Sequence, residues 1–241
     1  FKDFGLFCIM LKLSVIIPVY NEKRTVLKLI DKVKKVNINN VVIEMIVVDD
    51  FSTDGTRDIL KKINSRSIRI FCHKKNMGKG AAIKTGLKHA SGGIILIQDA
   101  DLEYNPEEYK KLLKPIINNK AEVVYGSRLD AIRKDIKNMY KLHYIGNLFL
   151  TLMTNLLYGA EITDMETGYK AFRREVIKNL NLRANRFDFE PEITAKIIKK
   201  GYKIYEVPIS FAGRKFEEGK KITWIDGIKA AYYLIKYRFA D

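Results

Sequence analysis

The chain has 241 residues, of which 47% are hydrophobic and 30% charged, so it can bury a sizeable core. Lys and Arg outnumber Asp and Glu by 44 to 28, a formal net charge of +16. This excess favours an anionic partner such as a phosphorylated ligand, an acidic lipid or a nucleic acid, although solvated lysines on helix faces explain much of it equally well. The sequence contains no run of about 18 consecutive apolar residues, so it predicts no clear transmembrane helix. Cys8 and Cys72 form no zinc or disulfide pattern, which favours a reducing, cytoplasmic setting.

Short apolar runs alternate with helical patterns in the first half of the chain. The apolar runs predict strands at 13–20, 42–50, 68–72, 93–101 and 121–127. The helical patterns lie at 23–36, 55–64, 79–90 and 106–119. Such alternation is typical of an α/β protein with a mostly parallel, doubly wound sheet flanked by helices. Ligands bind such sheets at the carboxyl ends of the strands, and the polar clusters of this chain follow its predicted strands.

The pattern changes after residue 130. A long apolar helical stretch at 138–159 is followed by a polar turn with the sequence EITDMETGYKAFRR. The remaining segments are a helix near 190–200, a strand at 202–211, a basic loop at 213–221 and a helix from Trp224 to about Phe239. We therefore expect a single domain over 12–221, a basic amphipathic helix over 222–241 and an N-terminal extension over 1–11.

Three acidic residues stand at alternate positions in IQDADLEYNP, at the end of an apolar run. In an extended segment Asp99, Asp101 and Glu103 would face the same side. Carboxylate oxygens are the ligands that Mg²⁺ and Mn²⁺ prefer, so the spacing predicts a divalent metal site. The alternative is a cluster of acids at a helix N-terminus, which explains the acids at 107–108 but not those at the end of a buried strand.

Two further motifs carry polar or glycine residues suited to a nucleotide. In VVDDFSTDGT, a carboxylate at Asp49 or Asp50 can accept hydrogen bonds from a base or a ribose, while the residues at 52–54 can cap the next helix. In NMGKGAAIKTG, Gly78 and Gly80 open a helix and can either approach a phosphate or allow close helix packing. The segment matches neither the P-loop nor the dinucleotide-binding pattern.

The order IIPVYNE, VVDDFSTDGT, NMGKGAA, DAD and YGSR resembles the motifs of the family-two glycosyltransferases, which have the GT-A nucleotide-binding fold. The later segments TDMETGYKAFRREV and GRKFEEGK resemble the polyprenyl-phosphate sugar synthase branch, typified by dolichyl-phosphate mannose synthase. The resemblance covers about residues 12 to 221. It implies an inverting transfer of a hexose from a nucleotide-sugar, GDP-mannose or UDP-glucose, to a dolichyl or undecaprenyl phosphate, with Mg²⁺ or Mn²⁺ as cofactor.

The resemblance also implies roles for individual residues. Those expected around the nucleoside are Pro18, Tyr20, Glu22, Val48 and Asp50. Those expected at the ribose and diphosphate are Asp99, Ala100 and Asp101, and the metal ligands are Asp99, Asp101 and Glu103. The basic residues expected to bind donor or acceptor phosphates are Arg128, Arg174, Arg214 and Lys220. The expected catalytic residues are Asp101, Arg128 and Arg214. The branch commonly has Gln where this chain has Glu103, so this chain adds a negative charge to the metal site.

A polyprenyl acceptor implies a membrane surface. The stretch 143–159 and the last helix, with Lys229, Lys236 and Arg238, are typical of interfacial helices. A packed helix or an oligomer contact is the alternative for 143–159. We expect a protein peripheral to the cytoplasmic face of the membrane, which docks there directly or through a membrane-anchored partner.

Two other functions are compatible with the sequence. A family-two enzyme could add sugar to a polysaccharide, a protein or another lipid, although the segments TGYKAFRR and GRKFEEGK argue against this. A nucleic-acid-binding module is suggested by charge alone, and the chain has no zinc finger, RRM signature or other reader motif. We therefore expect no nucleic-acid partner.

Overall fold

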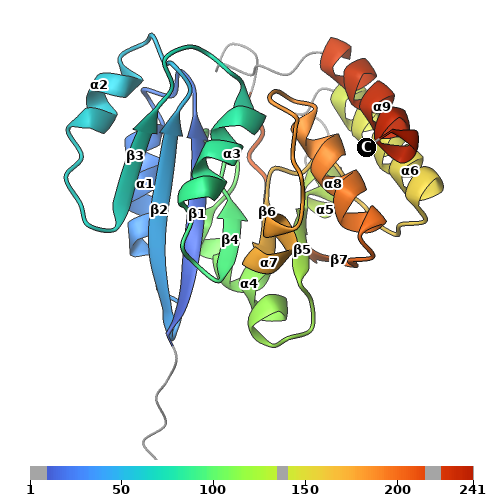
Figure 1. The fold of residues 1–241 in the computed structure, drawn as a ribbon, viewed down its shortest axis with the longest axis horizontal. Helices are drawn as coiled ribbons and strands as arrows, with labels where there is room; N and C mark the ends of the chain where they lie inside the picture. The colour runs from blue at the N-terminus through green and yellow to red at the C-terminus, as the bar shows by residue number, and fades with distance from the viewer. Residues whose placement is uncertain (1–9, 135–140, 215–223, 241) are drawn as a thin grey trace, which may run out of the picture.

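The computed structural model describes residues 10–134, 141–214 and 224–240 (Figure 1). Within these residues one seven-stranded sheet runs in the order β3-β2-β1-β4-β6-β5-β7. Its strands are β1 (Leu11–Val19), β2 (Val41–Asp49), β3 (Ile68–Cys72), β4 (Ile94–Ile97), β5 (Val123–Ser127), β6 (Lys170–Arg173) and β7 (Ile204–Pro208). Only β6, among these strands, is antiparallel to its neighbours. The predicted mostly parallel α/β sheet is therefore confirmed.

Helices cover both faces of the sheet (Figure 1). The longer ones are α1 (Val26–Lys35), α3 (Lys79–His89), α4 (Tyr109–Ile117), α6 (Lys141–Tyr158), α8 (Phe189–Lys199) and α9 (Trp224–Phe239). The shorter ones are α2 (Thr56–Lys61), the 3-10 turn η1 (Pro106–Glu108), α5 (Leu129–Lys134) and α7 (Arg174–Lys178). Helices α1 and α4 pack on one face with the alternate residues Leu13, Val15 and Ile17 of β1. Helices α3 and α8 pack on the other face, which Ile16 joins, as strand alternation requires.

The register of the parallel strands brings their carboxyl ends to one edge. Strands β1 and β2 pair residue for residue, with Val19 opposite Asp49 at the end. Burying the apolar stripe of α1, made of Val26, Leu29, Ile30 and Val33, contributes roughly 1.5–3 kcal/mol per side chain to this arrangement. The loops that carry the predicted motifs therefore start from a fixed edge of the sheet.

The structure corrects two sequence predictions near that edge. Strand β4 ends at Ile97 instead of residue 101, and the acidic motif forms a turn in which Leu102 has a φ of 65°. The expected extended placement of Asp99, Asp101 and Glu103 on one side is therefore wrong. The segment predicted as a polar turn near 170 contains β6 and α7, because Ala171 and Phe172 pack into the two layers of the core.

Helices α6 and α9 lie side by side beyond the β7 end of the sheet (Figure 1). Leu150 of α6 and Ala230 and Leu234 of α9 share a small core, and the Tyr158 hydroxyl donates to the Leu234 carbonyl. The packed-helix alternative for 143–159 is thus correct for one face of α6. No helix in the described part of the chain is both long enough and apolar enough to cross a membrane.

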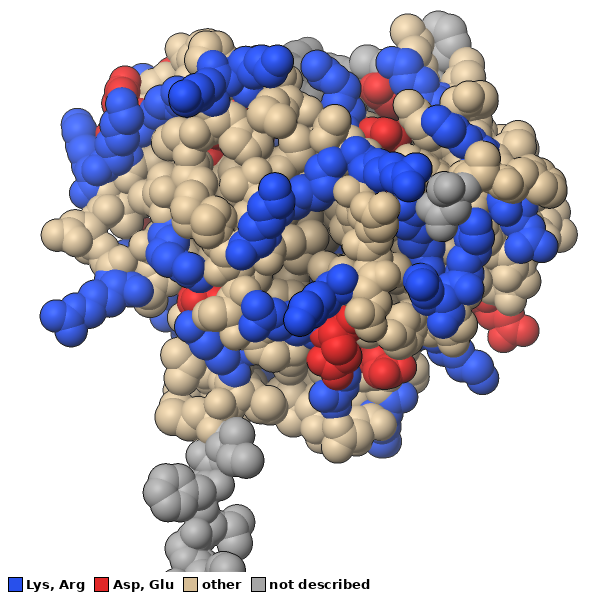
Figure 2. Space-filling view, viewed as in Figure 1, with Lys and Arg blue, Asp and Glu red and all other residues tan. Residues whose placement is uncertain are grey.

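Basic side chains are spread over one whole face of the molecule. Figure 2 shows Lys and Arg side chains distributed across the whole face in view, with few acidic ones among them. Such a distribution agrees with solvated lysines on the surface, which repel one another and favour solubility.

Candidate active site

A cavity of about 850 Å³ lies at the carboxyl edge of the sheet. Loops after β1, β2, β4, β5 and β7 carry charged side chains of its wall, and side chains of α6 and α9 form its apolar part. Ten of the sequence-predicted residues line it: Pro18, Tyr20, Glu22, Asp50, Asp99, Ala100, Asp101, Glu103, Arg128 and Arg214. The structure thus brings together residues from five separate segments of the chain.

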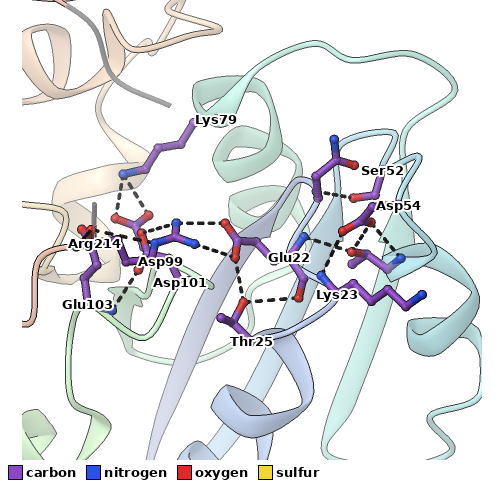
Figure 3. A network of polar contacts seen from close by, with 12 residues as sticks. Glu22, Lys23, Thr25, Ser52, Asp54, Lys79, Asp99, Asp101, Glu103 and Arg214 are labelled. Atoms are coloured by element: carbon purple, nitrogen blue, oxygen red, sulfur yellow. Dashed lines mark hydrogen bonds and ion pairs between the residues drawn. The ribbon is translucent and has the colours of Figure 1, made fainter. Parts of the chain in front are cut away.

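Arg214 contacts three acidic residues from two of these loops (Figure 3). Its Nη1 and Nη2 each lie 3.1 Å from a different Glu22 oxygen, which is a forked pairing, and Nη2 lies 3.2 Å from Asp101 Oδ2. The backbone N–H of Arg214 donates to Glu103 Oε1 at 2.8 Å. These contacts fix the loop after β7 against the acidic turn and raise the pKa of Arg214, although burial opposes that rise.

A second chain of charges runs from the acidic turn to α8. Lys79 Nζ lies 2.9 Å from Asp99 Oδ1 and 3.0 Å from Glu190 Oε1, and Lys170 Nζ lies 2.9 Å from Glu190 Oε2. Burial alone would raise the pKa of Glu190, but the two lysines hold it below its ordinary value. The sequence did not predict a role for Lys79, Lys170 or Glu190. Lys79 stands between the glycines of the 76–86 motif, whereas a buried pairing of Lys170 with Glu190 has no local signal.

Arg128 is held by a buried acid that sequence reasoning also missed. Its Nε and Nη2 donate to the two oxygens of Asp164 at 2.7 Å each, and its backbone N–H donates to Oδ2 at 2.9 Å. Burial would raise the pKa of Asp164, but the guanidinium holds it below its usual range. Arg128 also lies over the Phe211 ring, 5.1 Å from its centre. The guanidinium is therefore fixed in place on the cavity wall.

Asp50 holds the glycine-rich loop. Its carboxylate accepts hydrogen bonds from the backbone N–H groups of Met77 and Gly78, at 2.9 and 2.7 Å, and lies 2.7 Å from His73 Nδ1. The structure favours the close-packing explanation for the glycines. A Cβ on Gly78 would lie 2.4 Å from the Asn185 carbonyl, and one on Gly80 would lie 2.7 Å from the Ala184 carbonyl.

Two of the predicted residues that the structure describes, Val48 and Arg174, do not line the cavity. Val48 is fully buried in the core of β2. Arg174 lies at the opposite edge of the sheet, where its N–H donates to Gly93 and its Nη1 to Ser91, because antiparallel β6 runs away from the cavity. Lys220 lies outside the described residues.

Comparison with known proteins identifies the family. Residues 14–180 match the family model described as Glycosyl transferase family 2. The chain belongs to this family. It is 32% identical over 240 residues to the UDP-N-acetylglucosamine--dolichyl-phosphate N-acetylglucosaminyltransferase of Methanococcus voltae, covering 92% of this chain and 94% of that one. It is 30% identical over 233 residues to the dolichol-phosphate mannosyltransferase of Pyrococcus furiosus, covering 94% of this chain and 64% of that one.

This family-2 chain has the same fold as a solved structure. That structure is the glucosyl-3-phosphoglycerate synthase of Mycobacterium tuberculosis in complex with Mn²⁺, uridine diphosphate and phosphoglyceric acid. The TM-score is 0.73 at 19% identity, covering 96% of this chain and 80% of that one. The predicted GT-A fold is confirmed, and so is the resemblance to the polyprenyl-phosphate sugar synthases.

The acidic turn of this family-2 chain holds more negative charge than its neighbours neutralise. Burial, and then the charges of Glu103 and Asp99, raise the pKa of Asp101 to about 7 against the opposing effect of Arg214. Burial also raises the pKa of Glu103. Asp99 faces Lys79 while Asp101 and Glu103 face Arg214, and within the described residues no three such side chains are arranged to hold a metal ion. The hard oxygen donors and the surplus charge nevertheless suit Mg²⁺ or Mn²⁺.

The raised pKa of Asp101 predicts an unusual pH dependence of stability. The folded chain binds this proton more tightly than the unfolded chain, so the stability that the proton contributes is present below about pH 4 and is lost as pH rises through about 7. We expect Asp101→Asn to be more stable than the parent at pH 8, by on the order of 1–4 kcal/mol, and the difference to vanish near pH 4. Urea unfolding at several pH values in EDTA measures this.

Glu44→Gln is the matched control with the opposite sign. The hydrogen bonds of Glu44 to Ser14 and Ser91 outweigh burial and lower its pKa to about 2, so its stabilisation is present above the unfolded pKa and is lost in acid. This variant should be less stable than the parent at pH 8. An Asp101→Asn chain no more stable than the parent at pH 8 would contradict the crowding of charge at the acidic turn.

Proposed function

We propose that this chain transfers a hexose, with inversion, from a nucleotide-sugar to a polyprenyl phosphate. The observation that carries the proposal is the cavity itself, which joins a wall of fixed charges to an apolar wall of α6 and α9. The charged wall suits a sugar diphosphate and the apolar wall suits a lipid. The relatives in M. voltae and P. furiosus are named as transferases for dolichyl phosphate and dolichol phosphate, which supports the same acceptor here.

The donor would lie along the edge of the sheet. Pro18, Tyr20, Glu22 and Asp50 would surround the nucleoside, and the turn at 99–103 would meet the ribose and diphosphate. GDP-mannose and UDP-glucose are the donors we propose. Asp101 and Glu103, with Asp99, would hold Mg²⁺ or Mn²⁺, which neutralises a departing diphosphate when bound. The M. tuberculosis synthase with the same fold was crystallised with Mn²⁺ and uridine diphosphate, which supports this choice of metal.

The chemistry requires charge stabilisation more than proton transfer. A lipid phosphate is already an anion near neutral pH, so it attacks the sugar without a strong general base. Two anions must then be held together while negative charge grows on the leaving diphosphate. Arg128 and Arg214 would provide that stabilisation, since their guanidinium groups are fixed by Asp164 and Glu22 and bind phosphate oxygens in pairs.

The apolar faces of α6 and α9 would place the cavity at a membrane surface. Ile145 and Phe149 of α6 line the cavity and are 60% and 57% exposed, and Ile228 of α9 also lines it and is 60% exposed. Further exposed apolar side chains on the two helices are Leu152, Leu156, Tyr232, Ile235 and Phe239. Lys229, Lys236 and Arg238 on α9 are exposed beside them and would meet acidic headgroups. We propose a peripheral position on the cytoplasmic face.

A transfer assay tests the proposed reaction. Radiolabelled GDP-mannose and UDP-glucose are incubated in parallel with the chain, a short polyprenyl phosphate and Mn²⁺ or Mg²⁺. We expect label to enter the organic phase with one of the two donors. Metal-dependent hydrolysis of a donor without organic-phase label would contradict the polyprenyl acceptor and leave a glycosyltransferase acting on a different one.

Two variants test the proposed catalytic residues. We expect Asp101→Ala and Arg214→Ala each to reduce transfer by a factor of about 10² or more, because Asp101 would hold the metal that neutralises the diphosphate and Arg214 would stabilise that charge directly. Initial rates at limiting donor and acceptor measure the loss. Arg69→Ala is the control. Arg69 lies on β3, pairs with Glu44 of β2 and is not part of the cavity lining. Normal turnover by a folded Asp101→Ala chain would remove that residue from the site.

Sedimentation with vesicles tests the membrane surface. We expect Leu156→Asp and Ile228→Asp each to reduce binding to vesicles that contain acidic lipid, because a carboxylate on the apolar surface opposes insertion. Leu27→Asp on α1 is the matched control, since Leu27 is an exposed apolar residue on a helix that lines no part of the cavity. Equal losses in all three variants would contradict docking through α6 and α9.

A further inference from the structure

Two buried carboxylates of the cavity wall have hydrogen-bonding capacity that the protein does not use. Glu190 stands in the first turn of α8 and is 6% exposed. Lys79 Nζ and Lys170 Nζ each contact one of its oxygens, at 3.0 and 2.9 Å, and no second donor among the described residues reaches either oxygen, although a carboxylate oxygen can accept two. The other donors of the lysines go elsewhere: those of Lys170 to the carbonyls of Met165 and Thr167, and those of Lys79 to Asp99.

Glu166 has the same deficiency. It lines the cavity, and its Oε1 is buried with no hydrogen-bond partner in the described structure. The segment passes close to the acidic turn at Gly168, where a Cβ would displace the Asp99 carboxylate. Burial and the neighbouring charge of Glu190 raise the pKa of Glu166 to about 7. A buried acceptor without a donor destabilises the protein, and a ligand that donates hydrogen bonds to it would relieve that penalty.

The chemistry of the two groups excludes a phosphate as that ligand. Carboxylates repel phosphate oxygens, and the guanidinium groups of Arg128 and Arg214 are the part of the cavity suited to phosphates. Glu166 and Glu190 instead accept hydrogen bonds from neutral O–H or N–H groups. In a nucleotide-sugar the neutral part that carries several hydroxyls beyond the diphosphate is the sugar. Phe187 and Phe189 line the same cavity and add apolar surface.

We infer that Glu166 and Glu190 bind the hydroxyl groups of the transferred hexose and select which hexose the enzyme uses. This inference rests on the proposed function, because it assumes a nucleotide-sugar donor in the cavity. A site built to hydrogen-bond a hydroxyl rejects a ligand that lacks it far more strongly than an apolar pocket rejects an extra group. The two carboxylates would therefore discriminate between donors that share a nucleotide and differ in the sugar.

Calorimetric titration tests the inference without relying on turnover. UDP, GDP, UDP-glucose, UDP-N-acetylglucosamine and GDP-mannose are titrated with Mn²⁺ into the parent chain, Glu166→Gln, Glu190→Gln and the control Glu44→Gln. Glu44 is as buried as Glu190 but lies outside the cavity lining, in a cluster with Ser14 and Ser91. We expect both cavity variants to bind the nucleoside diphosphate within about twofold of the parent and the preferred nucleotide-sugar at least tenfold more weakly. The control should change neither affinity.

Deoxy-sugar donors supply a readout that a merely structural role would not change. For the preferred donor, the parent should lose at least tenfold in affinity when one hydroxyl is removed from the sugar. Glu190→Gln or Glu166→Gln should show no further loss for that same analogue, because the partner of the hydroxyl is already weakened. Equal weakening of diphosphate and nucleotide-sugar in both variants, or unchanged binding of the sugar, would overturn the inference.

The same titrations separate this inference from the proposed function. A parent chain that binds none of the nucleotides or nucleotide-sugars overturns both. A parent chain that shows the expected losses in the variants but transfers nothing to polyprenyl phosphate supports the hexose subsite and overturns only the acceptor.

Discussion

Buried charge at the carboxyl edge of the sheet is the constraint on which the rest of the site depends. Carboxylates taken out of water are stable only when cations or strong hydrogen bonds meet them. Arg214 therefore connects the loops after β1, β4 and β7, and Lys79 and Lys170 connect the acidic turn to α8. The balance is incomplete, as the raised pKa values of Asp101 and Glu166 show. The cavity is thus already organised for a ligand that brings positive charge or hydrogen-bond donors.

The sequence predicted the parallel part of the fold and the side of the sheet that carries the site, because apolar runs and the loops after them are local signals. It could not predict β6. That strand has four residues, is antiparallel and is stabilised by neighbours far away in the chain. For the same reason Arg174 was expected in the cavity and lies at the other edge of the sheet. The sequence did not predict Glu190, Asp164 and Lys170 as site residues, because the tertiary structure alone brings them to their partners. The DAD motif, by contrast, stands out by composition.

The two walls of the cavity divide the proposed work. The charged wall, with Arg128 and Arg214, is rigid because each guanidinium is fixed by a buried acid. The apolar wall belongs to helices whose outer faces are exposed and whose inner faces share a small core. Under the proposed function, a lipid phosphate would reach the sugar from the membrane side while the nucleotide is held at the sheet. Because both walls belong to one cavity, substrate recognition and membrane docking would then be physically linked.

The packing of α6 against α9 also affects how the chain folds during its synthesis. Tyr158 and Leu234, which join the two helices, are 76 residues apart in sequence. At about 5–20 residues per second, the ribosome would complete α9 roughly 4 to 15 seconds after α6. During that interval Leu150 and Met153 have no α9 to pack against, and the apolar outer face of α6 is exposed as well. Transiently exposed apolar surface of this kind promotes aggregation of a nascent chain, so α6 would need protection until α9 is made.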